Sequence, residues 1–256
     1  MADGGLLSIQ KVTKCFGGFT AVDGISFDIP RGVIAGLIGP NGAGKTTLFN
    51  TIAGFSKPDA GQVFLDGGPI HNRQPHQIFA QGLSRTFQIP RPFPEMSVLE
   101  NVMLVPFRQS GEMFWNNWIY PGTVAEEEEA NRTRAQEIIS FCSLTEVQAD
   151  QASTLSGGQL KLLELARVLM ADPKIILLDE PAAGVNPSLI VTLVEKIKAL
   201  NERGYTFLII EHNMDVVMSI CEPILVMSQG RLLYQGDAEG ARNNKAVLDA
   251  YLGDLA

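Results

Sequence analysis

The chain has 256 residues, of which 45% are hydrophobic and 19% charged, and its formal net charge is −8. This length suits one α/β domain, or one domain that carries a subdomain, and the acidic balance argues against a broad face for nucleic acid. The three cysteines lack metal-ligand spacing, no apolar run approaches the ~18 residues that cross a bilayer, and the first residues lack a signal-peptide pattern. We therefore expect a soluble protein with reduced thiols, which would reach a membrane only through a partner.

The N-terminal part predicts a small, largely antiparallel sheet. Residues 6–14 and 20–29 alternate as strands do and are separated by the turn Gly17-Gly18, and residues 62–66 form a third candidate strand. Phe16 stands in the first turn, where an exposed aromatic ring could stack on a purine base or pack on the sheet. The pattern alone leaves both alternatives open.

A phosphate-binding loop follows. The segment Gly39-Pro40-Asn41-Gly42-Ala43-Gly44-Lys45-Thr46 fits G-x-x-x-x-G-K-[ST] and lies between an apolar run at 33–38 and a helical pattern at 47–53. The glycines let backbone N–H groups turn around a polyphosphate at the positive end of a helix. Lys45 would reach the β- and γ-phosphates and the Thr46 hydroxyl would ligate Mg²⁺. The chain is thus predicted to bind a nucleoside triphosphate.

The middle of the chain reads as a helical insertion. A helix at 74–81 and a strand at 83–87, ending at Gln88, precede the proline-rich segment 89–94. Helical periodicity then covers 98–105, 125–142 and 158–170. Trp115 and Trp118 lie in a loop-like part of this region, where core packing is the default and a partner-facing surface the alternative.

Strand–helix alternation returns after Pro173. The expected strands are 175–178, 205–210, 224–227 and 232–235, and the expected helices are 187–203, 213–220 and 244–252. The run 175–178 is apolar without alternation, which is typical of a strand buried on both faces.

Polar residues follow the apolar strands at four points: Gly39, Gln88, Asp179-Glu180 and Glu211-His212. Since ligands of open parallel sheets bind beyond the carboxyl ends of the strands, we expect these segments to converge near the phosphate loop. Asp179 would be the second anchor for Mg²⁺ and Glu180 would accept a proton from the attacking water. Gln88 could contact Mg²⁺ or that water, and His212 could hydrogen-bond the γ-phosphate or position the water.

The segment Leu155-Ser156-Gly157-Gly158-Gln159 opens the helix that runs to Met170. Ser156 and Gln159 have the spacing of a capping box. Two glycines in a first turn cost helix stability, which makes sense if backbone must approach an anion at the helix N-terminus.

Five motifs follow one another along the chain: the phosphate loop, Gln88, the segment 155–159, the strand that ends at Glu180, and His212. In this order they resemble the motifs of ATP-binding cassette (ABC) ATPases, and the resemblance covers essentially the whole chain. The resemblance implies an α/β P-loop NTPase (RecA-like) core with an antiparallel β subdomain, comprising 1–88 and 172–256, and a helical signature subdomain at 89–171. It implies a head-to-tail dimer, in which Ser156, Gly157, Gly158 and Gln159 cover the ATP held by the partner's phosphate loop. Nucleotide contacts would extend from residues 39–46 to Thr47. Asp179 would hold Mg²⁺, Glu180 would be the general base, His212 the switch residue and Phe16 the ring that stacks on adenine.

More narrowly, the chain is similar to the ATP-binding subunits of branched-chain amino acid importers, the LivG type, through the stretches 85–88, 181–187, 211–214 and 250–253. Asn186 departs from the general ABC pattern, which usually has Asp there. The resemblance implies an ATPase on the cytoplasmic face of the plasma membrane, which works with a second ATPase subunit, identical or related. It would sense permease subunits through Gln88 and the helical segment. An external solute-binding protein would be an indirect partner, and nucleic acid would not be a partner. Urea, amides or other polar solutes are alternative cargoes. A soluble ABC ATPase acting on nucleic acid or ribosomes, and a small-molecule kinase, are the rival functions.

Overall fold

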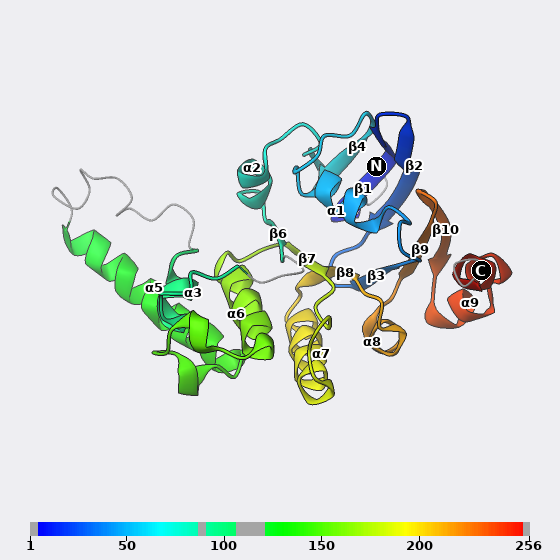
Figure 1. Ribbon diagram of the computed structural model, residues 1–256. Helices are drawn as coiled ribbons and strands as arrows, with labels where there is room; N and C mark the ends of the chain where they lie inside the picture. Colours follow the sequence, from blue (N-terminus) through cyan, green and yellow to red (C-terminus); the bar gives the residue numbers. More distant parts are fainter. Residues whose placement is uncertain (1–4, 87–90, 106–120, 253–256) are drawn as a thin grey trace. The chain divides into compact units, whose positions relative to one another are not determined.

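The computed structural model describes residues 5–86, 91–105 and 121–252 (Figure 1). These residues form two compact units, which are described separately below. Unit 1 comprises 5–86, 174–183 and 197–252, and unit 2 comprises 91–105, 121–173 and 184–196. Gln88, Trp115 and Trp118, which the sequence singled out, lie outside the described residues.

Unit 1 contains a four-stranded antiparallel sheet with the strand order β2-β1-β4-β5. Its strands are β1 (Leu7–Phe16), β2 (Phe19–Ile29), β4 (Ala60–Leu65) and β5 (Gly68–Pro69). The sequence predicted the first three. It missed β5 because a two-residue strand that begins at the second glycine of a Gly-Gly turn has no alternation to read.

The second sheet of unit 1 is mostly parallel and has the strand order β10-β9-β3-β8-β7-β6. Its strands are β3 (Ile34–Ile38), β6 (Leu83–Arg85), β7 (Ile175–Asp179), β8 (Thr206–Ile210), β9 (Ile224–Ser228) and β10 (Arg231–Gly236). Only the β9–β10 pair is antiparallel among the described strands of this sheet. Every residue of β3, β7 and β8 is buried, which explains their continuous apolar sequences.

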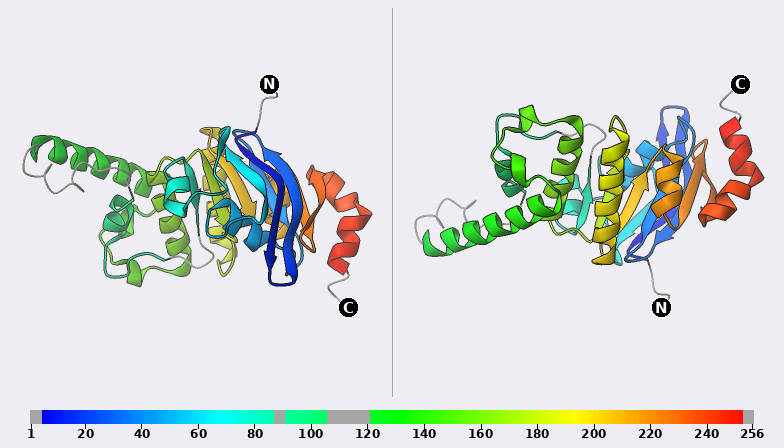
Figure 2. Two further views of the ribbon diagram at one scale, coloured as in Figure 1. Left: turned by 90° about the horizontal axis from the view of Figure 1, so that it is seen from above. Right: turned by 90° about the horizontal axis from the view of Figure 1, so that it is seen from below.

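Helices cover both faces of the parallel sheet. The antiparallel sheet and α1 lie on one face and α8 on the other (Figure 2). The helices of this part are α1 (Lys45–Ile52), α2 (Pro75–Phe79), α8 (Met214–Ile220), α9 (Ala238–Asn243) and α10 (Lys245–Leu252), and α7 (Pro187–Glu202) begins in unit 2 and ends in unit 1. The sequence did not predict α9, because Gly240 interrupts its short pattern. Asp237 nevertheless starts this helix by accepting a hydrogen bond from the Gly240 amide at 2.7 Å.

Unit 2 is helical, as the periodicity predicted. It contains α3 (Val98–Met103), α5 (Pro121–Phe141) and α6 (Gly157–Met170), which pack on one another, with short 3-10 turns at Thr145–Val147 and Ala152–Thr154. The fully buried Asn101 holds the proline-rich segment in front of α3. Its amide accepts a hydrogen bond from the Phe93 amide at 2.8 Å and donates to the Met96 carbonyl at 3.2 Å.

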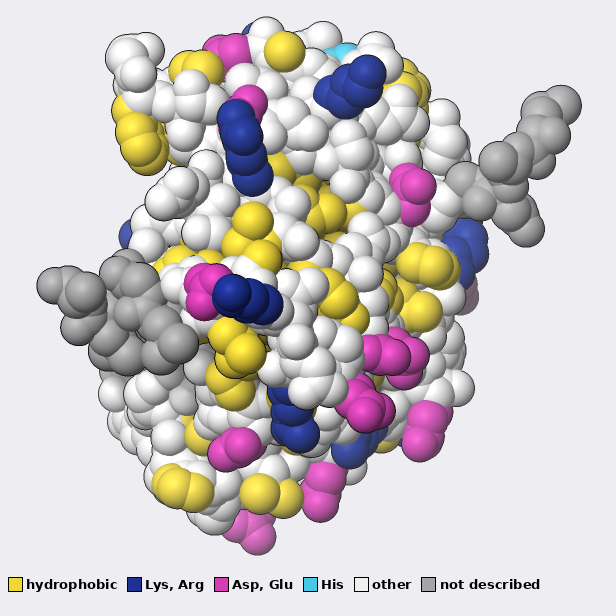
Figure 3. Space-filling model, turned by 90° about the vertical axis from the view of Figure 1, so that its right-hand side faces the viewer, with side chains coloured by type: hydrophobic (Ala, Val, Ile, Leu, Met, Phe, Trp, Pro, Cys, Tyr) yellow, Lys and Arg dark blue, Asp and Glu magenta, His cyan; other side chains and the backbone are white. Residues whose placement is uncertain are grey.

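Among the described residues, no helix combines the length and the apolar character needed to span a bilayer. Figure 3 shows the face that carries β10 and the C-terminal helices. Lys and Arg side chains lie there among Asp and Glu side chains, and hydrophobic side chains form small groups. On the described side chains of this face, charge is therefore mixed rather than uniformly basic.

Candidate functional site

The phosphate loop joins β3 to α1, and two of its glycines are required by the packing. Gly39 has φ 152° and Gly44 has φ 98°, a region that L side chains rarely adopt. A Cβ on Gly39 would lie 2.1 Å from the Met227 carbonyl oxygen, and one on Gly44 would lie 2.2 Å from the Ala21 carbonyl oxygen. The loop can therefore pass β2 and β9 only because these positions lack side chains.

Tyr251 of α10 reaches the same loop. Burial raises the pKa of its hydroxyl to about 12, against the opposing effect of a hydrogen bond from the backbone of Gly39. The end of the described chain thus packs onto the start of the phosphate loop.

Lys45 is folded back onto its own loop. The side chain is only 6% exposed, and its Nζ donates to the Gly39 carbonyl at 2.7 Å and to the Pro40 carbonyl at 2.9 Å. These carbonyls neutralise part of the ammonium charge. An incoming phosphate would compete with them for the same donor.

The loop walls a pocket of about 300 Å³. Its lining combines residues 41–47, from the phosphate loop and the start of α1, with Phe19, Ala21, Glu180 and His212. The phosphate loop, the end of β7 and the segment after β8, which we expected at one edge of the sheet, therefore come together in unit 1. Gln88, the fourth, lies outside the described residues.

Glu180 and His212 are in direct contact in this pocket. The His212 Nε2 lies 3.1 Å from the Glu180 Oε1. Glu180 has φ 49°, a left-handed backbone conformation that is uncommon for a residue with a side chain and that tends to occur at functional sites. Its amide donates to the Ile210 carbonyl at 2.9 Å, which holds this conformation at the end of β7.

Glu211 connects the segment after β7 to the segment after β8. This buried carboxylate accepts hydrogen bonds from the amides of Ala182 at 2.6 Å, His212 at 3.0 Å and Asn213 at 3.2 Å. Backbone amides stabilise a carboxylate in this way without a cation. The sequence indicated Glu211 only as the residue before His212 and did not predict that it connects these two segments.

Asp179 is buried at the end of β7, with 4% of its surface exposed. Its amide donates to the Thr86 hydroxyl at 3.3 Å, and its carboxylate pairs with Arg85. Thr46, the other predicted Mg²⁺ ligand, is exposed on the first turn of α1. A hydroxyl and a carboxylate are the hard oxygen donors that suit Mg²⁺ when substrate phosphates complete its shell.

The aromatic residue at the pocket wall is Phe19, which the sequence did not single out. Phe16 and Phe19 face each other across the β1–β2 hairpin and are 55% and 65% exposed. Phe19 lines the pocket, whereas the ring of Phe16 has the Lys14 Nζ at 5.5 Å from its centroid. A second aromatic residue three positions from the first, in the same turn, was the available signal.

The segment 155–159 begins α6 in unit 2. Ser156 forms the capping box with Gln159: the Gln159 amide donates to the Ser156 Oγ at 3.3 Å, and the Ser156 amide donates to the Gln159 Oε1 at 2.9 Å. A Cβ on Gly158 would lie 1.5 Å from the Leu189 Cδ2, whereas one on Gly157 would meet nothing within 4 Å. Gly158 is therefore a packing requirement of unit 2, and only Gly157 leaves open space in front of the helix.

Asn186, the departure from the general pattern, caps α7. Its Oδ1 accepts hydrogen bonds from the Leu189 amide at 2.9 Å and the Ser188 hydroxyl at 2.8 Å. An aspartate could accept the same two bonds, so the departure leaves the start of this helix unchanged.

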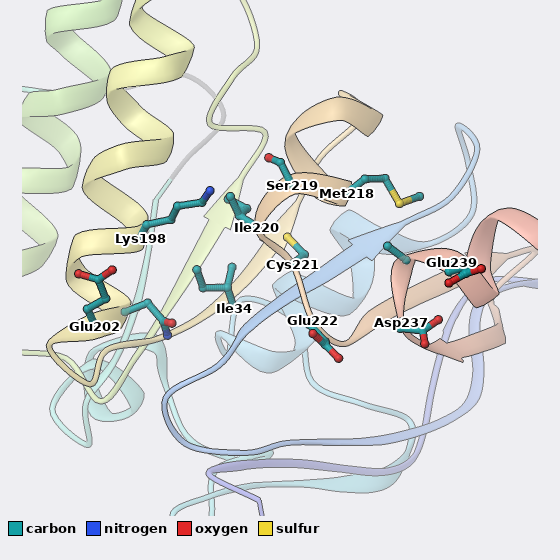
Figure 4. A pocket seen from close by; sticks show the side chains of 12 residues that line it. Ile34, Lys198, Glu202, Met218, Ser219, Ile220, Cys221, Glu222, Asp237 and Glu239 are labelled. Atoms are coloured by element: carbon teal, nitrogen blue, oxygen red, sulfur yellow. The ribbon is translucent and has the colours of Figure 1, made fainter.

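A larger groove of about 510 Å³ lies at the other end of the parallel sheet, where β3 begins (Figure 4). Its charged residues are mostly acidic: Glu202, Glu222, Asp237 and Glu239, with Lys198 on α7. Burial and the charge of Glu211 raise the pKa of the Cys221 thiol in its wall to about 12. An acidic lining does not suit a polyphosphate, so the smaller pocket is the candidate nucleotide site.

The chain matches the family model of the ABC transporter over residues 22–183. It is 41% identical over 248 residues to the "Probable branched-chain amino acid transport ATP-binding protein LivG" of Archaeoglobus fulgidus, covering 97% of this chain and 95% of that one. It is 38% identical over 250 residues to the "High-affinity branched-chain amino acid transport ATP-binding protein LivG" of Escherichia coli K12, covering 97% and 98%.

Two solved structures of ABC ATPase cassettes have a similar fold. An ATP-binding cassette from an ABC transporter in its ADP conformation superposes with a TM-score of 0.83 at 37% identity, covering 97% of this chain and 98% of that one. A dimeric, post-hydrolysis cassette bound to ADP and Pi gives a TM-score of 0.73 at 26% identity, covering 90% and 98%. The fold class and the ATPase class that the sequence predicted are confirmed, whereas the roles of single residues and the subdomain boundaries stay predictions. The chain belongs to the ABC transporter family and is one of its ATP-hydrolysing cassettes.

Proposed function

We propose that this ATPase powers the import of branched-chain amino acids or a related small solute through separate permease subunits. The observation that carries the catalytic part is the 300 Å³ pocket in which the phosphate loop, Glu180 and His212 meet. The cargo rests on relatives whose printed names specify branched-chain amino acid transport.

In the proposed cycle, residues 39–47 hold the triphosphate through backbone amides and the positive end of α1. Lys45 leaves the Gly39 and Pro40 carbonyls, now 2.7 and 2.9 Å away, and donates to the β- and γ-phosphates. The hairpin aromatics Phe16 and Phe19 contact the base.

Glu180 is the proposed general base, which takes a proton from the water that attacks the γ-phosphate. The 3.1 Å contact with His212 supports this assignment, because it fixes the carboxylate at the pocket wall. His212 is proposed to hydrogen-bond the γ-phosphate and so to report its presence. Gln88, which would contact the water or the cation, lies outside the described residues.

Mg²⁺, when bound with ATP, neutralises charge on the β- and γ-phosphates. The residues proposed to hold it are Thr46 through its hydroxyl and Asp179 through its carboxylate, directly or through water. Among the described residues there is no group of three or more His, Cys, Asp and Glu side chains that could hold a metal by itself.

The second half of each site is proposed to come from another ATPase subunit, identical or related. Ser156, Gly157, Gly158 and Gln159 would then cover the γ-phosphate held by the partner's loop. The exposed α6 start and the open space in front of Gly157 support this role, as does the dimeric cassette among the structural relatives. The pair would sit on the cytoplasmic face of the membrane, moving permeases that receive solute from an external binding protein.

The catalytic proposal is tested by Glu180→Gln, with Glu222→Gln as the matched control at the far end of the sheet. We expect Glu180→Gln to retain ATP binding, to lose at least about 100-fold in turnover, and to accumulate an ATP-bound dimer. Glu222→Gln should behave as the unchanged protein in all three measurements. Normal steady-state hydrolysis by Glu180→Gln would remove Glu180 from the mechanism.

The cargo and partner proposal is tested by capturing tagged Glu180→Gln with ATP from detergent-solubilised membranes of the source cell. Multi-spanning permeases in the eluate, identified by mass spectrometry, support the importer. Uptake of labelled leucine and of labelled urea by the reconstituted complex then separates the two cargo classes. An eluate with only soluble or ribosomal partners would favour the rival function instead.

A further inference from the structure

A buried ion pair stands directly behind the candidate site. Arg85 ends β6, and its Nη2 lies 2.7 Å from the Oδ2 of Asp179 at the end of the neighbouring strand β7. The two side chains are only 7% and 6% exposed. A charged pair at this depth loses much of its hydration, so each partner depends on the other for compensation.

The same guanidinium makes a second, directed contact. Its Nη1 donates to the Asn50 Oδ1 at 2.6 Å. The rings of Phe49 and Phe55 lie on the guanidinium with centroids 5.7 Å from its carbon, a distance at which an aromatic face attracts a cation. Arg85 is therefore held in one place, with its two terminal nitrogens aimed at two different acceptors.

These two acceptors belong to the two elements that carry the proposed Mg²⁺ ligands. Asn50 is on α1, whose first turn carries Thr46, and Asp179 ends β7. One planar group thus connects the helix of the phosphate loop to the strand that ends in the carboxylate. A lysine could not reproduce this, because its ammonium is a single point on a flexible chain.

We propose that Arg85 is a positioning residue for the cation that accompanies the nucleotide. It holds the Asp179 carboxylate through Oδ2 and the helix that carries Thr46 through Asn50, so that the two residues that would hold the cation keep their relative positions. This inference rests on the proposed function of Asp179 and Thr46 as cation ligands.

The test measures cation binding rather than turnover. Mn²⁺ replaces Mg²⁺ and is titrated by electron paramagnetic resonance in the presence of the non-hydrolysable analogue AMP-PNP. The affinity for AMP-PNP in EDTA is measured separately. The variants are Arg85→Gln, Arg85→Lys and Asn50→Leu, and the control is Arg231→Gln, which breaks an exposed pair with Asp23 (2.8 Å) elsewhere in unit 1.

We expect the Mn²⁺ concentration for half-saturation to rise about 10-fold in Arg85→Gln and Arg85→Lys and about 3-fold in Asn50→Leu, the 10-fold change corresponding to about 1.4 kcal/mol. AMP-PNP affinity in EDTA should stay within about 2-fold, since the phosphate loop itself is intact. The control should change neither value. Arg85→Gln leaves a buried carboxylate uncompensated, which destabilises the fold. Arg85→Lys and Asn50→Leu therefore keep the test decisive.

Folded Arg85→Lys and Asn50→Leu proteins with unchanged Mn²⁺ half-saturation would overturn the inference. Asp179→Asn separates this from a failure of the proposed function. If Asp179→Asn loses Mn²⁺ binding while the Arg85 and Asn50 variants keep it, only the role of Arg85 is wrong. If Asp179→Asn itself keeps normal Mn²⁺ binding, the assignment of Asp179 as a ligand is wrong.

Discussion

The phosphate loop and the segment 155–159 are both glycine-rich starts of helices, but they differ in how much of a site each one builds. The loop is enclosed by β2, β9 and α10 within unit 1, and its lysine is 6% exposed. The start of α6 is exposed, and the side chains of Ser156 and Gln159 accept hydrogen bonds from each other's backbone amides. The first region is proposed to bind phosphate with groups from one chain, whereas the second is proposed to complete the site of another chain.

The difference also separates two uses of glycine. In the phosphate loop, Gly39 and Gly44 are needed because backbone carbonyls of other strands approach within 2.1 and 2.2 Å of where a Cβ would be. In α6, a Cβ on Gly158 would clash with the side chain of Leu189 in the same unit, whereas a Cβ on Gly157 would meet no atom within 4 Å. Similar composition therefore reflects different physical demands in the two regions.

The largest effect should come from a matched pair of single substitutions, one in each region. Lys45→Ala removes a charged donor to the phosphates, and we expect at least about 100-fold weaker ATP binding by the isolated chain. Ser156→Ala removes a helix cap that is worth about 1 kcal/mol but should leave that binding unchanged. It should lower turnover only where two chains associate. Fluorescence titration with a labelled nucleotide and concentration-dependent ATPase rates make the comparison.

If Ser156→Ala weakened ATP binding at protein concentrations where the chain is monomeric, the proposed division between the two regions would be wrong. The Glu222→Gln protein serves again as the reference for folding and purity.

A smaller effect is expected at the paired glycines of α6. Gly158→Ala forces a Cβ against Leu189 and should destabilise the fold by about 1–3 kcal/mol, which lowers Tm by roughly 2–10 °C. Leu189→Ala in the same chain should restore part of that loss, because it removes the clashing Cδ2. Gly157→Ala should leave Tm equal or slightly higher, since alanine favours a helix over glycine. Differential scanning calorimetry measures all three.

Equal Tm values for the Gly157→Ala and Gly158→Ala proteins would show that Leu189 does not limit the space at α6. In that case both glycines would have to be explained by the partner chain.

The smallest effect is expected at the aromatic hairpin. Phe16→Ala and Phe19→Ala should each weaken ATP binding about 5-fold, because stacking on a base is worth about 1–3 kcal/mol. Inorganic triphosphate should bind equally to both variants and to the unchanged protein. Competition titration with ATP and with triphosphate separates the base from the phosphates. An unchanged ATP affinity in Phe16→Ala, with a loss in Phe19→Ala, would transfer the stacking role to Phe19.

Much of the fold could be predicted because its elements carry local signals. The strands β3, β7 and β8 are apolar throughout, since both their faces are buried. α6 carries its own capping box. The elements that the sequence missed, β5 and α9, have two and six residues, too few to show a period.

The candidate site divides in the same way. The sequence by itself located the phosphate loop, the two acids where β7 ends and the histidine after β8, because polar residues at strand ends follow from a local pattern of residue types. Only the tertiary structure decided that Phe19 lines the pocket, that Glu211 joins two loops, that Leu189 occupies the space at Gly158 and that Arg85 connects Asn50 to Asp179. The reason is physical: each of these contacts joins residues distant in the chain or depends on which way a side chain points, and neither is encoded in the spacing of neighbouring residues.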